Sequence, residues 1–190
     1  MVHRYNKDTQ SRILKEANRL FMSKGYQATS TREIAKNAGV TQPNLYHYFG
    51  DKEKLYTAVL EEHLLTVGKD LRAILDENKT DFQKALIQMT NYLVQTHLLD
   101  LFMMLHDLKL HLSSDLQTHL FYLWKKSYRE PFEIVFSMNQ AALRNHITTE
   151  MAAKHFFLLL APYITESTSS LENPFSVEQF IDLYLNGVLK

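Results

Sequence analysis

Residues 29–54 constrain this 190-residue chain more than any other segment, because they predict two short helices joined by a tight turn. Ser30 and Glu33 have the spacing of a capping box, in which each side chain bonds to the backbone near the other. Apolar residues at helical spacing follow, and Gly39 then permits the left-handed backbone of a turn. We therefore expect the first short helix to begin near Ser30 and to end before Gly39.

The second short helix presents two different faces. Thr41 is placed to cap it, and Pro43 is tolerated in its first turn. The side chains that can face inward are Leu45, Tyr48 and Phe49, and those left to face outward are Gln42, Asn44, Tyr46 and His47. A short helix that is held by a partner and exposes polar and aromatic tips is typical of a helix-turn-helix, whose second helix enters the DNA major groove.

Charge is distributed unevenly along the chain, although the formal net charge is zero. Residues 1–56 hold 10 Lys and Arg against 5 Asp and Glu, whereas residues 57–190 hold 11 against 16. A basic N-terminal part followed by an acidic remainder favours a module that binds a polyanion such as DNA.

The whole chain predicts an all-α fold of about nine helices, since strand signals are lacking and only 5 Gly and 4 Pro residues interrupt it. Besides the two short helices, the expected segments are residues 9–23, 51–75, 82–97, 98–112 and 113–138, one that starts at 148 or 149, and 176–189. Pro131 is expected to kink the helix at 113–138.

Residues 9–60 resemble the N-terminal domain of TetR-family transcriptional regulators. The similarity lies in an amphipathic helix that ends in KGY, in the segments TSTREIAKNAGV and LYHYFGDKEKL, and in their spacing. It implies a helix-turn-helix domain at 1–50 and an effector-binding and dimerisation domain at 51–190, with the helix from Asp51 linking them. The implied function is that of a ligand-responsive repressor, which binds a palindromic operator in double-stranded DNA as a homodimer and is released by a small molecule.

The resemblance also implies which side chains contact DNA. Lys52 matches a lysine that binds phosphate, and a phosphate would offset the unfavourable position of a cation at a helix N-terminus. The expected DNA-binding residues are Thr31, Arg32, Thr41, Gln42, Pro43, Asn44, Tyr46, His47 and Lys52. Of these, Gln42 or Asn44 can pair with adenine through two hydrogen bonds.

A dimer requires a further apolar face, and the C-terminal helices offer one. Apolar residues occupy two sides of each of the last two helices, so that one side can face the protomer's own core and the other a twin. The predicted dimer interface is Phe156, Leu160, Tyr163, Phe180 and Tyr184. The aromatic-rich middle of the chain is expected to enclose an apolar or amphipathic effector, with Phe102, His106, Trp124 and Tyr128 as lining residues.

Histidine and aspartate residues at 97–119 leave an alternative open. Asp107 and His111 are four residues apart, as are Asp115 and His119, so each pair shares a helix face. A metal-responsive regulator of the same fold, with His and Asp ligands, is therefore the alternative function. Paired surface residues or Asp–His hydrogen bonds explain the pattern better, and no metal residue is assigned.

Other function classes find little support in the sequence. There is no cysteine, no Gly-rich phosphate loop and no catalytic set at known spacing, so neither an enzyme nor a cofactor is expected. No signal segment and no membrane-spanning run is recognisable, which predicts a cytoplasmic protein without a membrane partner. An adaptor that retained the fold but lost DNA binding is the remaining alternative, and the intact set of Thr31, Gln42, Tyr46 and Lys52 argues against it.

Overall fold

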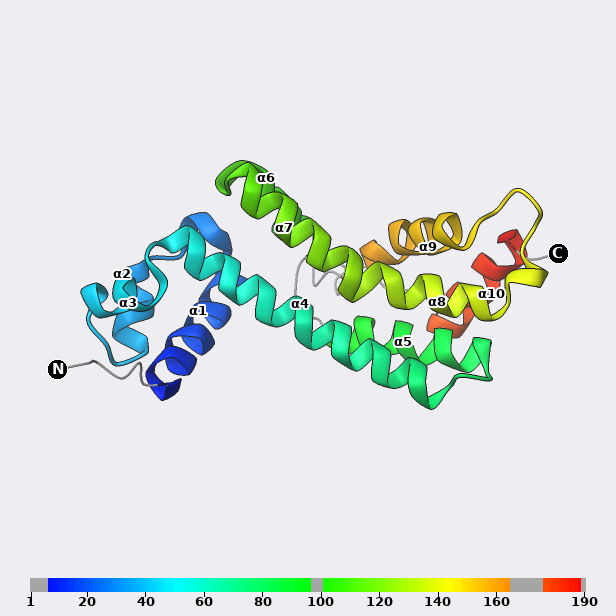
Figure 1. Cartoon of the computed structure of the whole chain (residues 1–190), viewed down its shortest axis with the longest axis horizontal. Coiled ribbons are helices and arrows are strands. Elements are labelled where there is room, and N and C mark those ends of the chain that lie inside the picture. Colours follow the sequence, from blue (N-terminus) through cyan, green and yellow to red (C-terminus); the bar gives the residue numbers. More distant parts are fainter. Residues whose placement is uncertain (1–6, 97–100, 165–175, 189–190) are drawn as a thin grey trace. The chain divides into compact units, whose positions relative to one another are not determined.

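The computed structural model describes residues 7–96, 101–164 and 176–188, and within these ranges it describes the side chains except those of 101–105, 162–164 and 188. Its helices are α1 (Lys7–Ala28), α2 (Thr31–Asn37), α3 (Gln42–Phe49), α4 (Lys52–Glu77), α5 (Phe82–Thr96), α6 (Leu101–His111), α7 (Ser114–Trp124), η1 (Lys125–Arg129), α8 (Glu130–Met138), η2 (Gln140–Ala142), α9 (Thr149–Ile164) and α10 (Val177–Val188). Helices α7, η1 and α8 follow one another without a break, so the described residues contain nine α-helical segments (Figure 1). The predicted all-α fold is confirmed.

The chain divides into two compact units. The first comprises Met1–His63 and Phe102–Phe121, and the second comprises Leu64–Leu101 and Tyr122–Lys190. Helix α4 therefore contributes its N-terminal half to the first unit and its C-terminal half to the second. The domains expected from the sequence, 1–50 for DNA binding and 51–190 for effector binding and dimerisation, are defined by function and not by contacts. That division therefore stays a prediction. Among the described residues, none of the helices combines the length and apolar character that a membrane crossing requires.

In the first unit, α1 supplies the surface against which the two short helices pack. Its apolar residues recur every three or four positions, so that Ile13, Ala17, Leu20 and Phe21 are all buried. Helix α2 packs on α1, and α3 packs on α2. The Phe21 ring also lies edge-on to the ring of Tyr56 in α4, with 4.8 Å between centroids. Helix α1 thus orients both the short helices and the start of α4.

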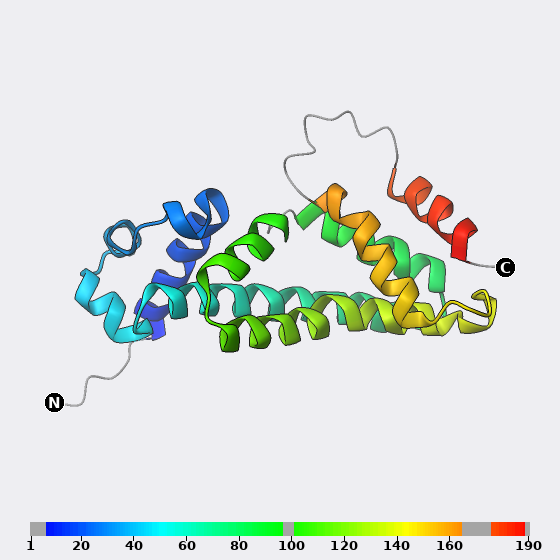
Figure 2. The ribbon, with the colours of Figure 1, turned by 90° about the horizontal axis from the view of Figure 1, so that it is seen from above.

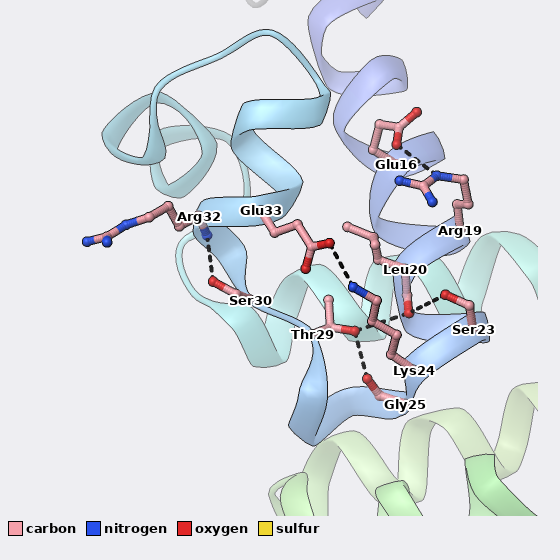
Figure 3. A network of polar contacts seen from close by, with 10 residues as sticks. All are labelled: Glu16, Arg19, Leu20, Ser23, Lys24, Gly25, Thr29, Ser30, Arg32 and Glu33. Carbon is pink, nitrogen blue, oxygen red and sulfur yellow. Dashed lines mark hydrogen bonds and ion pairs between the residues drawn. The ribbon is translucent and has the colours of Figure 1, made fainter.

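A network of hydrogen bonds and an ion pair connects the end of α1 to the start of α2 (Figure 3). Gly25 adopts φ 76° and ψ 175°, which interrupts the helical backbone and frees carbonyl oxygens of the preceding turn. The Thr29 hydroxyl lies 2.8 Å from the carbonyl oxygen of Gly25 and 3.1 Å from that of Leu20. The Lys24 ammonium donates to the Glu33 carboxylate at 2.7 Å and so links α1 to α2. Helix α1 is longer than the predicted segment 9–23 because it resumes for one short turn after Gly25.

The second unit has an aromatic core. Helices α5, α8, α9 and α10 pack together there (Figure 2). The Phe156 ring lies 5.4 Å from the Phe180 ring and 5.2 Å from the Tyr184 ring, which joins α9 to α10. The Phe132 ring meets Phe157 edge-on at 4.8 Å, which joins α8 to α9. This interlocking of rings fills the interior and leaves other apolar side chains of α9 and α10 outside.

The predicted kink near Pro131 takes the form of a π turn. Pro131 has no N–H, and its ring would clash with the carbonyl group four residues earlier, so the helix widens at η1 immediately before it. The Lys126 carbonyl oxygen there accepts a hydrogen bond from the Arg72 guanidinium of α4 at 2.7 Å. Gly68 lies one turn before Arg72 on α4, and a Cβ placed on Gly68 would lie 2.9 Å from Ser127 Cα. The glycine therefore allows α4 to approach the π turn closely.

We expect Gly68→Ala to lower the free energy of unfolding by about 1–3 kcal/mol, because the added methyl group forces α4 and η1 apart. Gly187→Ala is the matched control, since a Cβ at that position of α10 meets no atom within 4 Å. That control should be neutral or gain up to about 1 kcal/mol from the loss of backbone freedom in the unfolded chain. Urea unfolding followed by circular dichroism compares the two, and equal stabilities would contradict the close approach.

Candidate nucleic-acid interface

The two short helices begin at the predicted capping residues. The Ser30 hydroxyl accepts from the backbone N–H of Arg32 at 3.2 Å, and the Thr41 hydroxyl accepts from the N–H of Asn44 at 3.3 Å. Gly39 has φ 69°, as expected for the turn between them. The second half of the expected capping box is not the contact formed, because the Glu33 carboxylate is bound to Lys24 instead.

Burial decides which sides of α2 and α3 remain available. Ile34, Ala35 and Leu45 are buried and Phe49 is 9% exposed, as predicted, whereas Tyr48 is half-buried. Among the expected DNA-binding residues, Gln42 and Lys52 are half-buried and Thr31 is buried. The exposed ones are Arg32, Thr41, Pro43, Asn44, Tyr46 and His47. The side of α3 that was predicted to face outward is thus exposed, with Gln42 half-buried at its start.

Three of these side chains form a closed polar cluster, which we call the Thr31–Gln42–Tyr46 triad. The Gln42 amide nitrogen donates to the Thr31 hydroxyl at 3.0 Å and to the Tyr46 hydroxyl at 3.2 Å. The two hydroxyl oxygens lie 2.9 Å apart, within hydrogen-bonding distance. The triad joins α2 to α3 and orients Gln42. The spacing of four residues between Gln42 and Tyr46 indicates a shared face, but only the packing of α2 on α3 brings in Thr31.

Lys52 begins α4 and lies over an aromatic ring. Its ammonium nitrogen is 4.4 Å from the centroid of Tyr26, the last residue of the KGY segment. Partial burial lowers the pKa of Lys52, and the Asp107 carboxylate and Tyr46 oppose that shift. The N-terminus of a helix concentrates positive potential, so the Lys52 cation and the first turn of α4 together suit an anion such as a phosphate. The N–H of Lys54 in that turn already donates to the Asp51 carboxylate at 2.7 Å.

Asp107 of α6 is a member of this site that sequence reasoning did not identify. Its side chain is buried, and its carboxylate accepts from the backbone N–H of Tyr26 at 2.8 Å and from the Tyr56 hydroxyl at 3.2 Å. Burial and this carboxylate raise the pKa of Tyr56 far above its ordinary value, so the phenol remains a donor. A buried carboxylate without such donors would be costly, and these two contacts connect α6 to α1 and α4.

The α6–α7 corner makes further contacts within the first unit. The His111 ring stacks on Tyr26 with 5.1 Å between centroids, and the backbone N–H of Ser113 donates to the Glu53 carboxylate at 2.6 Å. The His119 imidazole lies 2.7 Å from the Glu61 carboxylate. Asp107, His111 and His119 thus each contact a protein group outside the His and Asp set. Among the described residues no group of three metal-ligating side chains occurs, and His97 and Asp100 lie outside them.

Residues 13–59 match the profile of a family described as "Bacterial regulatory proteins, tetR family". The uncharacterized HTH-type transcriptional regulator YvkB of Bacillus subtilis (strain 168) is 34% identical over 87 residues, which is 46% of this chain and 44% of YvkB. The N-terminal part of this chain thus has the sequence of a TetR-family domain. Its relatives are named as transcriptional regulators and not as enzymes.

Further likenesses divide between the N-terminal sequence and the fold. The HTH-type transcriptional repressor KstR2 of Mycolicibacterium smegmatis is 33% identical over 72 residues, which is 38% of this chain and 35% of KstR2. The matches therefore span less than half the length of these relatives. Escherichia coli NemR in its reduced form has a TM-score of 0.76 at 17% identity over 96% of this chain and 98% of that chain, a likeness of fold alone.

The residues expected to line an effector site fall into different places. Trp124 and Tyr128 both lie edge-on to Phe157 in the second unit, at 6.1 and 6.3 Å between centroids. Burial raises the pKa of Tyr128 well above its ordinary value. His106 belongs to the first unit and its side chain is 68% exposed, and the side chain of Phe102 lies outside the described residues. The structure thus brings together two of the four.

The expected dimer residues of the last two helices lie mainly in the protomer's own core. Phe156, Leu160, Phe180 and Tyr184 are all buried there, and the side chain of Tyr163 lies outside the described residues. The apolar residues that the same helices expose are Leu158, Leu159 and Leu183, at 62%, 53% and 70%. Residues of both apolar sides recognised in the sequence face the core, since Phe157 of α9 and Ile181 of α10 are buried as well.

We expect Asp107→Asn to lower the free energy of unfolding by about 1–3 kcal/mol, because an amide cannot accept as strongly and leaves buried donors poorly paired. Asp76→Asn is the control, since Asp76 makes an exposed ion pair with Lys79 whose loss should cost less than about 1 kcal/mol. Urea unfolding measures both, and equal effects would show that Asp107 does not hold the first unit together.

Proposed function

We propose that this chain is a DNA-binding transcriptional repressor that binds a palindromic operator as a homodimer and is released by a small-molecule effector. The observation that carries the proposal is the Thr31–Gln42–Tyr46 triad on α2 and α3, together with Lys52 at the N-terminus of α4. Base-contacting and phosphate-contacting groups are needed together at a DNA interface, because the first specify sequence and the second position the protein.

The exposed face of α3 supports insertion into the major groove. An α-helix fits that groove, where Gln and Asn side chains contact base edges and apolar groups contact the thymine methyl. We assign Gln42, Pro43 and Asn44 to base contacts, and Tyr46 and His47 to the backbone on either side. Thr41 and Arg32, which are exposed at the starts of α3 and α2, complete the set, with Lys52 on a phosphate.

The proposed regulatory direction is supported by a named relative, and the proposed symmetry of the operator by the small reach of one helix-turn-helix. KstR2, one of the relatives, is named a repressor, which supports repression here. One helix-turn-helix contacts few base pairs, so two copies are needed, with half-sites about 34–36 Å apart or a multiple of that spacing. Action on chromosomal DNA would place the protein in the cytoplasm.

Homodimer formation is best supported by the exposed leucines of α9 and α10. Leu158 and Leu159 share one side of α9 with Met151, whose exposed fraction is 40%. Leu183 lies on the exposed side of α10. Homodimer interfaces are typically formed by exposed apolar side chains on helices whose other side packs against the core.

An apolar or amphipathic effector is supported by the aromatic cluster of Trp124, Tyr128 and Phe157 beside the π turn η1. A π turn is common where a helix serves a functional site. An effector would act by favouring a spacing of the two DNA-binding units that no longer matches the operator. The metal-responsive alternative has no described cluster of ligands in its favour.

Selection of bound DNA from a random pool, followed by mobility shifts over a range of salt, tests the proposal. A palindrome should be recovered, and the logarithm of the affinity should fall linearly with the logarithm of salt concentration. Recovery of no sequence, together with no binding in dilute buffer, would refute DNA binding by this chain.

We expect Lys52→Ala to weaken binding to every operator by about 1.5–3 kcal/mol, because it removes a charge-assisted contact to phosphate. The salt slope should decrease by about 1 for each half-site. Lys79→Ala is the control, since Lys79 is exposed in the second unit and should leave both quantities unchanged. A loss confined to some operators would contradict the phosphate role.

We expect Leu183→Glu to weaken the dimer by at least about tenfold, because it introduces an unpaired charge into an apolar interface. Leu65→Glu is the control, because Leu65 is similarly exposed, at 58%, but lies on α4. Sedimentation equilibrium measures the dissociation constant of each variant. A dimer that tolerates Leu183→Glu but is lost with Leu65→Glu would place the interface elsewhere.

A further inference from the structure

The Thr31–Gln42–Tyr46 triad is closed, in that each of its three polar atoms contacts the other two. The distances are 3.0 Å from Gln42 Nε2 to Thr31 Oγ1, 3.2 Å from Gln42 Nε2 to Tyr46 Oη, and 2.9 Å between the two oxygens. Three hydrogen bonds require three hydrogens, and this number limits how the Gln42 amide can be oriented.

Only one amide orientation supplies enough hydrogens. With the nitrogen inward, the Gln42 NH₂ group provides two hydrogens, and one of the two hydroxyl groups provides the third. With the oxygen inward, both hydroxyl hydrogens would point at Gln42, and the 2.9 Å contact between Thr31 and Tyr46 would lack a hydrogen. The nitrogen therefore faces the hydroxyls, and its two N–H groups point at two oxygens that are only 2.9 Å apart, so both hydrogen bonds are bent.

Burial also decides which of the two hydroxyl groups, Thr31 or Tyr46, donates to the other. Thr31 is 7% exposed and Tyr46 is 38% exposed, so the buried hydroxyl is the one that most needs an internal partner. Thr31 accordingly donates to Tyr46, and the Tyr46 hydroxyl hydrogen is left to point away from the triad, where it can donate to a phosphate. The cluster thus presents one outward donor from Tyr46 and one outward acceptor, the Gln42 Oε1 atom.

We infer that Gln42 recognises the exocyclic amino group of adenine or cytosine as an acceptor only, and that it does not form the two-bond pair with adenine expected from its residue type. This inference rests on the proposed function, since it concerns the base contact of α3 in the major groove. Adenine and cytosine offer an amino donor there, whereas guanine and thymine offer oxygen atoms that would repel Oε1.

The experiment compares base analogues at the operator position that Gln42 contacts. That position is located by repeating the pool selection with Gln42→Met, which removes the amide but keeps the length of the side chain. At an adenine there, 7-deazaadenine lacks N7 and purine lacks the amino group. Wild-type affinity should fall about tenfold with purine and remain within about twofold with 7-deazaadenine. At a cytosine, substitution by thymine should produce the same tenfold loss.

Two sets of variants connect this result to the triad. Thr31→Val with Tyr46→Phe removes both hydroxyl groups and frees the Gln42 N–H groups, so a loss of affinity with 7-deazaadenine should now appear at an adenine position. Thr31→Ser keeps the hydroxyl and should retain the wild-type response. Gln42→Met should respond to neither analogue.

The outcomes separate the inference from the proposed function. If the wild-type protein binds its operator but loses affinity with both analogues, Gln42 donates as well as accepts and the inference is wrong while DNA binding stands. The inference is also wrong if Gln42→Met changes no position of the selected operator. If no duplex is bound at any salt concentration, the proposed function fails, and the inference fails with it.

Discussion

Helices α2 and α3 contain seven and eight residues, which is too short for stability in isolation. They exist because their inner faces, which include Ile34, Ala35 and Leu45, are buried within the first unit. A helix held in this way cannot rotate about its axis without exposing its apolar side, so its outer face is fixed as well. The Thr31–Gln42–Tyr46 triad depends on this constraint, because it requires α2 and α3 to meet at one defined orientation.

The surroundings of Lys52 depend on a second element, α6. Asp107 satisfies its buried carboxylate with the N–H of Tyr26 and the hydroxyl of Tyr56, and Tyr26 in turn lies under the Lys52 ammonium. The proposed phosphate contact therefore shares a packing unit with Phe102–Phe121. A change in α6 would alter the donors and rings around Lys52 directly.

Local signals predicted much of the fold and part of the site. The caps at Ser30 and Thr41, the turn at Gly39 and the exposed face of α3 all depend on residues within one helical turn of each other, and the structure has them as expected. Contacts between distant residues were not predictable in the same way. Glu33 binds Lys24 and not the cap, and α1 resumes after Gly25, because tertiary neighbours compete with local partners.

The sequence by itself determined the all-α class, the approximate helix boundaries and the helix-turn-helix, because helical periodicity, capping residues and turn glycines act over a few residues. Tertiary structure decided which apolar residues of α9 and α10 are buried, since both sides of each helix are hydrophobic and the ring packing of Phe156, Phe180 and Tyr184 sets the orientation of the two helices. It also decided the role of Asp107 and the orientation of the Gln42 amide. Both features depend on hydrogen-bonding groups that come from different helices, and residue spacing along the chain does not predict such contacts.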